Sequence, residues 1–465
     1  DEVRNAVTRD QKHSDQALIL FDDALTRIEQ EADAADRAYK LFRETQVRYG
    51  GSVTVQDKGE LRDRLSKLGA ELDRYLAGEY GINVEKTKDF EAWKTSHHPF
   101  HWLVEFFGIM RDGGFDVIIG NPPYVEYSKA RSEYEVRRYP TENCGNLYAY
   151  VLERSLSLSA NRTYCGMIVP LSLATTERMR PLQELLVAAQ RHMWMSHFDV
   201  YPCKLFEGAK QRLTIIVMGK TSTAPTIVTT RYMRWGPQER AALISLLHFG
   251  PSHFRPDLAV VPKAPCPISR SILSKLANRR PAPFVDADGR VSFFVHRIPY
   301  NYIKAFDFVP YFRNEVDGEK KSADYKPYRL ATSGDERALL ATLNSNLFFW
   351  WWYTLFEGYH CGKHEIYAFP VGLDAMSPAV RDRLQCLATE LMADIQRNKK
   401  RKRCRYKNTG EVVYDEFYPR LSKGTIDEID LVLAEHFGFD PPEVDFLINY
   451  HLKYRLGTEL EKGDE

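Results

Sequence analysis

The stretch Asn121-Pro122-Pro123-Tyr124 combines residue types that could polarise a weakly nucleophilic amine. The side-chain oxygen of Asn121 and the main-chain carbonyl of Pro122 can accept hydrogen bonds from the two N–H bonds of an exocyclic amine on a nucleobase. These bonds localise the lone pair of the amine as its nitrogen becomes tetrahedral. The two prolines fix the turn, so the acceptors need not reorganise during the reaction. The tetrad therefore predicts a site where such an amine attacks an electrophilic methyl group.

The tetrad directly follows the apolar run Phe115-Asp-Val-Ile-Ile119. A β-branched run that is stopped by glycine and two prolines predicts a buried strand, and open α/β sheets bind ligands at the carboxyl ends of their strands. Chance predicts only about 0.02 tetrads of this type in a chain of this length. We therefore prefer a functional role to that of a rigid strand-terminating turn. Tyr124 offers a flat ring on which an extruded base can stack.

Strands and helices alternate after the tetrad. The sequence predicts strands at 164–169, 197–201, 213–218 and 226–232, with helices at 147–158 and 178–190. This alternation is typical of an α/β fold in which helices cover a mixed, Rossmann-like sheet. The short connection between the last two strands predicts that they form an antiparallel hairpin at one end of the sheet.

The segment before the sheet, residues 1–95, is highly charged and predicts a helical hairpin packed on the larger body. Leucine and tyrosine recur at three- and four-residue steps between Leu61 and Leu76, which is the period of one helix face. An earlier helix is predicted over 15–42. The residues of its expected buried side are Phe21, Leu25, Ile28, Ala32, Ala35 and Tyr39.

The segment after the sheet begins with proline-rich, basic stretches that mark a linker and a new domain. Residues 336–347 predict a helix that continues into the aromatic run 348–353. That run is too apolar for a base-stacking platform, so we assign it to a core. The last forty residues predict two helices broken at 438–442.

Residues 397–407 form the one dense basic run of the chain. Its cations could neutralise several phosphates and give salt-dependent DNA affinity, or they could be the solvated end of a helix, and both interpretations stay open. The candidate DNA-binding side chains are Lys399, Lys400, Arg401, Lys402, Arg403 and Arg405. Other side chains that could reach bases, in no order, are Tyr300, Tyr302, Lys304, Arg313, Lys320 and Lys321.

Composition excludes several classes of protein. A hydrophobic fraction of 44% and a charged fraction of 27% exclude wholesale disorder. Lys and Arg number 64 against 63 Asp and Glu, which excludes a generally polycationic protein but not a local basic face. No apolar run approaches the roughly 18 residues of a membrane span. The seven cysteines are scattered without a C-x-x-C pair, which argues against a disulfide framework and for a reducing, cytoplasmic setting.

Two groups of histidines could be mistaken for metal sites. His360, Cys361 and His364 could bind zinc with a distant ligand such as Cys386, but their spacing is irregular and no second pair exists, so we predict no metal. The histidines at 97, 98 and 101 flank Pro99 and aromatic residues, and we assign them to packing.

Several stretches resemble the gamma-class DNA N6-adenine methyltransferases of bacterial restriction–modification and phage-defence systems, particularly the C-terminal portion of large single-chain members of the type IIG, BREX and DISARM kinds. The resemblance covers essentially the whole chain. Its strongest stretches are 98–102 and 113–124. Further similar stretches are Gly145-Asn-Leu-Tyr148 with Glu153-Arg154, Gly166–Pro170, Leu205-Phe206 ahead of 211–216, Asn344-Ser345, Ile426–Asp430, Asn449-Tyr450 and Lys453–Arg455.

The resemblance implies methylation of the exocyclic amine of a flipped adenine in double-stranded DNA, with S-adenosylmethionine as cofactor. Catalysis is then assigned to Asn121, Pro122, Pro123 and Tyr124, and Asn121 and Pro123 also contact the cofactor. Phe206 covers the face of the adenine opposite Tyr124. The implied domains are a helical insertion at 1–95, a catalytic methyltransferase half at 96–235, a target-recognition domain at 236–430 and a helical tail at 431–465.

The chain departs from this family in one respect. The glycine-rich loop and acidic residue that hold the cofactor lie upstream of the tetrad in the family, and nothing between Asp1 and Gly120 resembles them. We therefore expect the C-terminal part of a longer protein with a methyltransferase or nuclease portion upstream, or a partner chain that supplies the cofactor half. A third possibility is a degenerate methyltransferase that binds DNA without reacting. The alternative function is that of a non-catalytic DNA-recognition subunit of a defence complex.

Overall fold

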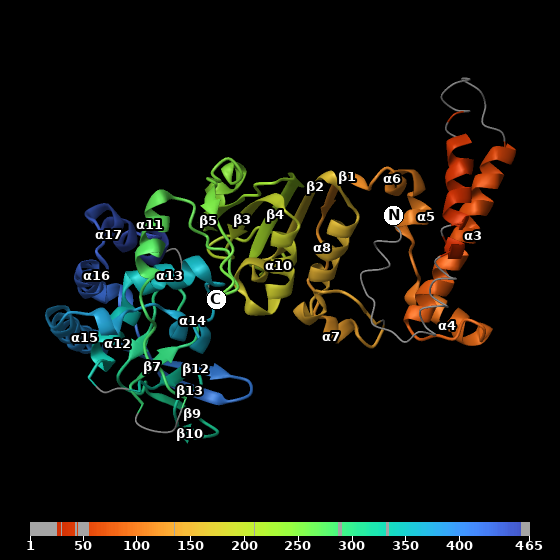
Figure 1. Ribbon diagram of the computed structural model, residues 1–465. Coiled ribbons are helices and arrows are strands. Elements are labelled where there is room, and N and C mark those ends of the chain that lie inside the picture. Colours follow the sequence, from red (N-terminus) through yellow and green to blue (C-terminus); the bar gives the residue numbers. More distant parts are fainter. Residues whose placement is uncertain are drawn as a thin grey trace. The chain divides into compact units, whose positions relative to one another are not determined.

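The computed structural model describes residues 26–28, 30–41, 44, 55–133, 135–208, 210–286, 291–331 and 334–456, which fall into two compact units (Figure 1). The first unit comprises Asp1–Ile118, Val125–Asn146 and Arg154–Tyr164. The second comprises Ile119–Tyr124, Leu147–Glu153 and Cys165–Glu465. Among the described helices, none is both long enough and apolar enough to span a membrane.

The first unit is largely helical, as its sequence predicts. A small apolar core joins Ile28 and Ala35 of the earlier helix to Leu68 and Phe107. Leu65, Leu72 and Tyr75 pack against this core, so the predicted leucine face is confirmed. Phe21 and Leu25 lie outside the described residues. The helices of this part are α3 (Val55–Glu79), α4 (Thr87–His97), α5 (Trp102–Glu105), α6 (Phe107–Arg111) and α7 (Tyr127–Ala130).

A six-stranded mixed sheet of order β1-β2-β4-β3-β5-β6 confirms the predicted α/β class. Its strands are β1 (Phe115–Gly120), β2 (Ser159–Pro170), β3 (Arg191–Phe198), β4 (Leu213–Thr221), β5 (Ile227–Met233) and β6 (Gly250–Ser252). The helices between them are α8 (Leu147–Ser157), α9 (Ser172–Thr175) and α10 (Arg180–Ala188). β3 runs antiparallel to β4 and parallel to β5, so the sheet mixes both directions.

The predicted hairpin at 213–232 is wrong. β4 and β5 do not pair with each other, because β3 lies between them and hydrogen-bonds to both. β3 lies in the interior of the sheet, with Met193 and Met195 buried on one face and Trp194 partly exposed on the other. The connection after β4 therefore passes the end of β3 rather than closing a two-strand turn.

The prediction that Phe115–Ile119 is a buried strand is also wrong. β1 is the edge strand of the sheet, and the side chains of Val117 and Ile119 are 64% and 84% exposed. The described residues leave Val117 and Ile119 largely uncovered, although both side chains are apolar. On the same sheet face, Trp194 pairs with Val217, and these side chains are also partly exposed.

The remainder of the second unit contains two small sheets and a helical core. The three-stranded sheet, of order β11-β7-β8, consists of β7 (Phe293–His296), β8 (Ala305–Phe306) and β11 (Tyr325–Tyr328). The four-stranded sheet, of order β10-β9-β13-β12, consists of β9 (Phe312–Asn314), β10 (Gly318–Glu319), β12 (Lys400–Tyr406) and β13 (Gly410–Glu416). The helices are α11 (Pro267–Leu276), α12 (Glu336–Asn344), α13 (Asn346–Leu355), α14 (Lys363–Ala368), α15 (Pro378–Asn398), α16 (Lys423–Phe437), α17 (Pro441–Ile448) and α18 (Leu452–Leu456).

The aromatic run is the centre of this core, which confirms its assignment. All ten residues of α13 are buried. The single helix predicted from 336 is instead broken at Ser345, whose hydroxyl oxygen accepts a hydrogen bond from the amide of Phe348 and caps α13. The predicted break at 438–442 is confirmed, since Gly438 has a φ of 70° and ends α16.

Candidate functional site

The tetrad forms the turn that follows β1. Asn121 is exposed, Pro122 is buried and Tyr124 is half-buried. The hydroxyl oxygen of Tyr124 lies 2.7 Å from Oδ1 of Asn121 and 2.8 Å from the carbonyl oxygen of Ile168 on β2. A phenol has one proton, so it donates to one of these acceptors at a time. The contact fixes the side chain of Asn121 with its oxygen toward the tyrosine.

Tyr124 must keep its hydroxyl proton in order to donate a hydrogen bond to Asn121. Burial raises the pKa of Tyr124 to about 12, so its hydroxyl stays protonated and remains a donor at neutral pH. A carbonyl oxygen has two lone pairs. When Tyr124 occupies one lone pair of Asn121 Oδ1, the other is still available to an incoming N–H group.

We predict that Tyr124→Phe slows methyl transfer by up to about tenfold, because it removes one hydrogen bond and keeps the ring. Tyr124→Ala should cost more, since it also removes about 1–3 kcal/mol of base stacking. Single-turnover methylation rates and DNA-binding titrations measure the two effects separately. If the Phe and Ala variants were equally slow, the ring would have no role of its own.

The carboxyl ends of several strands meet at the edge of the sheet that carries the tetrad. β2 and β3 both run antiparallel to β4, and β3 is parallel to β5, so these three strands end at one edge. The bond between Tyr124 and Ile168 places the tetrad near the end of β2. Phe206 lies in the loop after β3 and is 37% exposed. Among the described residues it makes no ring contact with Tyr124.

A buried polar network lies directly after β3 and β5, and sequence reasoning missed it. Asp199 is 1% exposed and accepts hydrogen bonds from Nε of Arg234 at 3.0 Å and from the hydroxyl of Tyr353 at 2.6 Å. Burial opposes the charge of Arg234, but Tyr353 and Asp199 outweigh it and raise the pKa of Arg234. Arg234 also donates to Asn301 at 2.9 Å. An acidic residue just past one strand and an arginine just past another were the only signals in the sequence.

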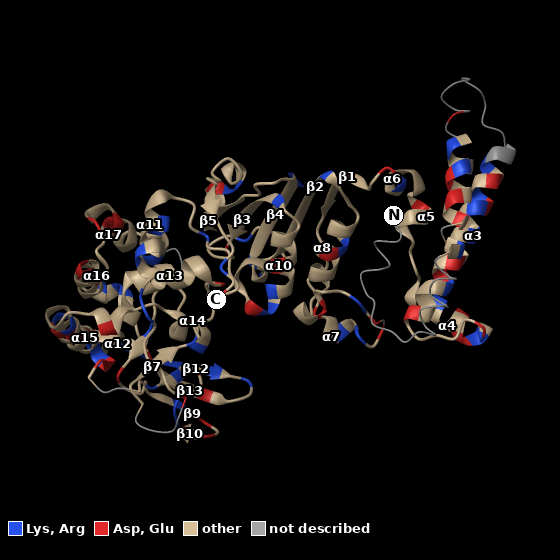
Figure 2. Cartoon of the chain, viewed as in Figure 1, with Lys and Arg blue, Asp and Glu red and all other residues tan. Residues whose placement is uncertain are grey.

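The basic run forms the edge strand β12 and its flanks, so the helix-end interpretation is wrong. α15 ends at Asn398, and the run pairs with β13 in antiparallel register. Lys and Arg colour much of this hairpin in Figure 2. Asp415 forms ion pairs with Lys399 at 3.0 Å and with Arg401 at 2.5 Å. Lys402 and Arg403 lie 3.5 Å from Glu416 and Glu411, respectively.

The two other candidates on β12 have no carboxylate partner among the described residues. Lys400 lies over the ring of Tyr418 at 5.5 Å. Arg405 lines a cavity of about 260 Å³ together with Arg313. Residues 399–416 contain seven Lys and Arg against three Asp and Glu, so the hairpin keeps a net charge of +4.

The other side chains proposed to reach bases are not brought together in one surface. Tyr302 is buried, and Arg455 lies 4.2 Å from its ring centre, so Tyr302 belongs to the interior. Tyr300 is 55% exposed and lines a cavity of about 480 Å³ together with the partly buried Lys304. Lys320 forms an ion pair with Asp317.

The histidines have partners of other kinds. His97 stacks on Trp93 and His101 pairs with Asp73 at 2.7 Å, which confirms their packing role. His360 binds the carboxylate of Glu357, and Cys361 is buried. The described residues contain no group of three or more His, Cys, Asp or Glu side chains that could hold a metal ion.

Comparison with known proteins finds similarity over the segment that contains the tetrad. Residues 61–206 match the model of the Eco57I restriction-modification methylase family. A stretch of 138 residues is 31% identical to RM.MjaORFECS2P of Methanocaldococcus jannaschii, which is named as a type II restriction enzyme and methyltransferase. That stretch covers 30% of this chain and 11% of the relative, so the chain spans a small part of the relative's length.

Solved structures with partial likeness include the type IIL restriction-modification enzyme MmeI in complex with DNA, with a TM-score of 0.35 and 11% identity over 74% of this chain and 55% of that chain. The type IIG restriction endonuclease BpuSI has a TM-score of 0.28 and 13% identity over 73% of this chain and 53% of that chain. At these TM-scores the family assignment depends on the sequence matches. The segment of this chain that resembles restriction-modification methylases in sequence, residues 61–206, includes β1 and the tetrad.

Proposed function

We propose that this chain carries the catalytic turn and the DNA-recognition part of a DNA adenine-N6 methyltransferase that acts in the cytoplasm, in restriction–modification or phage defence. The observation that carries the proposal is the contact between Tyr124 and Asn121 at the end of β1. It orients an uncharged acceptor at the edge of a methylase-family sheet, where an amine can meet it.

In the proposed reaction, one adenine is rotated out of the duplex at a cost of a few kcal/mol and stacks on Tyr124. Asn121 Oδ1 and the carbonyl oxygen of Pro122 accept the two N–H bonds of its exocyclic amine. The lone pair of that nitrogen then points away from the ring plane, toward the electrophile. Phe206 would close on the opposite face of the base. Because neither acceptor titrates, the chemical step needs no group with a shifted pKa.

S-adenosylmethionine would supply the electrophilic methyl group when bound. Asn121 and Pro123 are the residues of this chain proposed to contact it. The described residues upstream of β1 form helices and no strand, so they offer no strand–loop–helix cradle for the rest of the cofactor. The proposal therefore assigns the remaining cofactor contacts to a polypeptide segment other than the described one.

The exposed apolar edge of the sheet is evidence in favour of a second polypeptide segment that packs against it. β1 exposes Val117 and Ile119, and Trp194 and Val217 add partly exposed apolar surface on one sheet face. An apolar edge strand that stays exposed to solvent favours aggregation, because it can pair with the strands of other molecules. A second segment that pairs with β1 and covers this face would complete the sheet and bring the cofactor cradle beside Asn121.

The test is a titration of radiolabelled S-adenosylmethionine against this chain alone and against the chain together with its upstream half. The proposal expects binding and DNA methylation only in the second case. DNA binding without cofactor binding in either case would favour the alternative, a non-catalytic recognition subunit of a defence complex.

We further propose residues 236–430 as the target-recognition part, with the β12–β13 hairpin contacting DNA phosphates. Reversing the two cations without carboxylate partners, in the double variant Lys400→Glu/Arg405→Glu, should weaken DNA binding. The slope of log K against log salt concentration should also become shallower by about 2, because each lost phosphate contact removes about 0.9 from the magnitude of that slope. Salt-dependent fluorescence anisotropy measures this. An equal effect from Arg62→Glu/Lys67→Glu, on the exposed side of α3, would show that only net charge matters.

A further inference from the structure

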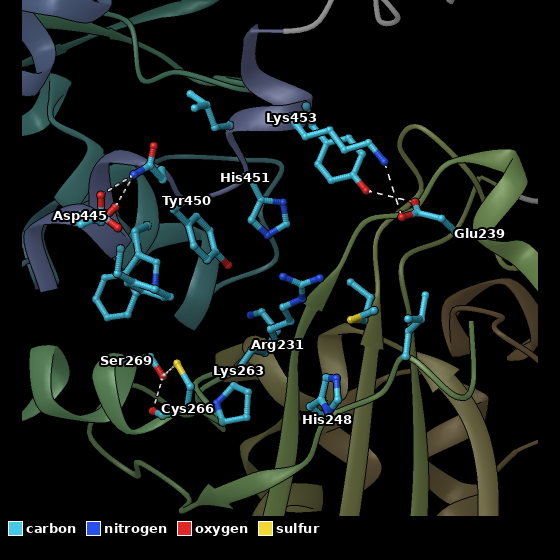
Figure 3. Close-up of a pocket in the computed structure, with 18 residues that line it drawn as sticks. Arg231, Glu239, His248, Lys263, Cys266, Ser269, Asp445, Tyr450, His451 and Lys453 are labelled. Carbon is cyan, nitrogen blue, oxygen red and sulfur yellow. Dashed lines mark hydrogen bonds and ion pairs between the residues drawn. The ribbon is translucent and has the colours of Figure 1, made fainter. Parts of the chain in front are cut away.

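A pocket of about 810 Å³ lies within the second unit, apart from the tetrad (Figure 3). Its walls come from the end of β5, the start of α11, α13 and the C-terminal helices. Neither the family match at 61–206 nor the proposed methylation uses these residues. The volume is within the range of small-molecule and cofactor sites.

His451 lines this pocket with two ring nitrogens that lack hydrogen bonds within the described part of the chain. Both of its ring nitrogens are buried, and neither has a hydrogen-bond partner among the residues that the structure describes. Its φ of 55° is in the left-handed region, which a residue with a bulky side chain rarely adopts. The rings of Tyr450 and Tyr353 pack against it at 4.3 and 5.3 Å, so its orientation is fixed. Unpaired buried nitrogens that line a cavity indicate a group that the cavity receives.

The surroundings of His451 are cationic. Burial lowers the pKa of His451 well below its usual range, and Arg234, Arg231 and Arg455 lower it further. The side chains of His451 and Arg231 extend toward the same part of the pocket in Figure 3. Arg231 is exposed and has no ion-pair partner among the described residues. The wall also includes Lys263, which is 2% exposed and donates to the carbonyl oxygen of Phe356 at 2.7 Å. Burial lowers the pKa of Lys263 well below its usual range, so Arg231 is the cation that this wall offers to a ligand.

The acidic residues of the pocket are already engaged. Glu239 accepts the amide of Gly236 at 2.7 Å and lies 3.5 Å from Lys453. Asp445 accepts a hydrogen bond from Asn449 at 2.8 Å. Neither of these carboxylates is paired with Arg231, so its guanidinium presents positive charge beside the aromatic rings of the pocket.

We propose that this pocket binds a phosphate ester, with Arg231 pairing with the phosphate and an N–H of His451 donating to it. Arginine suits phosphate because its planar guanidinium donates two parallel hydrogen bonds. The phosphate can belong to a free nucleotide, whose base would lie against the aromatic wall, or to the DNA backbone. This site does not depend on the identity of the methylated base.

The test titrates the full chain with inorganic phosphate, with adenosine monophosphate and with a short DNA duplex, by calorimetry. Each titration is repeated for Arg231→Ala and for the control Lys220→Ala, an exposed cation on β4. Saturable mononucleotide binding that Arg231→Ala weakens at least tenfold, and the control does not, supports the proposal with a free nucleotide as the source. Duplex binding weakened in the same selective way, without mononucleotide binding, supports it with a backbone phosphate.

A second variant, His451→Phe, keeps a ring in the same place and removes both nitrogens. It should weaken whichever ligand Arg231→Ala weakens. Thermal unfolding of each variant verifies that the fold is intact. The proposal is overturned if Arg231→Ala leaves the affinity for all three ligands unchanged, or weakens them no more than Lys220→Ala does.

Discussion

Replacing Asn121 with alanine in the complete enzyme should reduce methyl transfer by roughly 10²–10³-fold, the loss typical of removing one preorganised polar group from a transition state. Within the part of the chain that the structure describes, the side-chain amide of Asn121 bonds to Tyr124, at 2.7 Å, and to no other residue, and Asn121 is exposed. Its loss should therefore leave folding and DNA affinity unchanged. Methylation rates under single-turnover conditions and parallel DNA-binding titrations check both parts.

Asn121→Asp is the matched control. It keeps an acceptor oxygen in the same position for the amine and for Tyr124, so it should retain more activity than Asn121→Ala. Substantial methyl transfer by Asn121→Ala would refute the assignment of Asn121. A loss of DNA binding together with activity would show a structural role instead.

Arg234→Met should lower the free energy of unfolding by about 3–5 kcal/mol, because it leaves the carboxylate of Asp199 buried with a lost partner. Asp199 is 1% exposed, and Arg234 is the closer of its two arginine partners, at 3.0 Å against 3.2 Å for Arg212. The same variant removes the donor to Asn301. Urea denaturation followed by tryptophan fluorescence measures the change.

Arg231→Met, three residues earlier on β5, provides the comparison. Arg231 is exposed and unpaired among the described residues, so the change should stay within about 0.5 kcal/mol. If Arg234→Met and Arg231→Met lowered the free energy of unfolding equally, the result would contradict a stabilising role of the buried network around Asp199. Because Asp199 directly precedes the loop that carries Phe206, a weakened network should also loosen the segment proposed to cover the base.

The elements with strong local signals could be predicted from sequence. The run Phe115–Ile119 is followed by glycine and prolines, so the strand and the position of the turn are specified by neighbouring residues. The same is true of the helix break at Gly438 and of the buried aromatic run in α13. The tetrad was identified because its residue types are rare in that combination.

Features that depend on distant residues could not be predicted in the same way. The short connection after β4 favours a hairpin locally, but the chain places β3 between the two strands. A basic run has no periodicity that separates a helix end from a strand, and β12 becomes a strand because β13 pairs with it. The bond from Tyr124 to Ile168 joins residues 44 positions apart, and that from Asp199 to Tyr353 joins residues 154 apart.

The exposed edge of β1 shows a further limit of sequence reasoning. An apolar, β-branched run predicts a buried strand, yet burial depends on which neighbouring strands and helices are present. In the described chain β1 has a neighbour on one side only. The exposure of Val117 and Ile119 therefore follows from the position of β1 at the edge of the sheet.

The most direct test is the identity of the methylated base. The complete enzyme is incubated with DNA and S-adenosylmethionine, the DNA is digested to nucleosides, and the products are separated by liquid chromatography and mass spectrometry. A turn that accepts both hydrogens of the exocyclic amine of adenine should yield N6-methyl-2′-deoxyadenosine, and Asn121→Ala should abolish that peak. A product methylated on carbon, such as 5-methylcytosine, would contradict the account, because attack from a ring carbon gains nothing from acceptors placed on an amine.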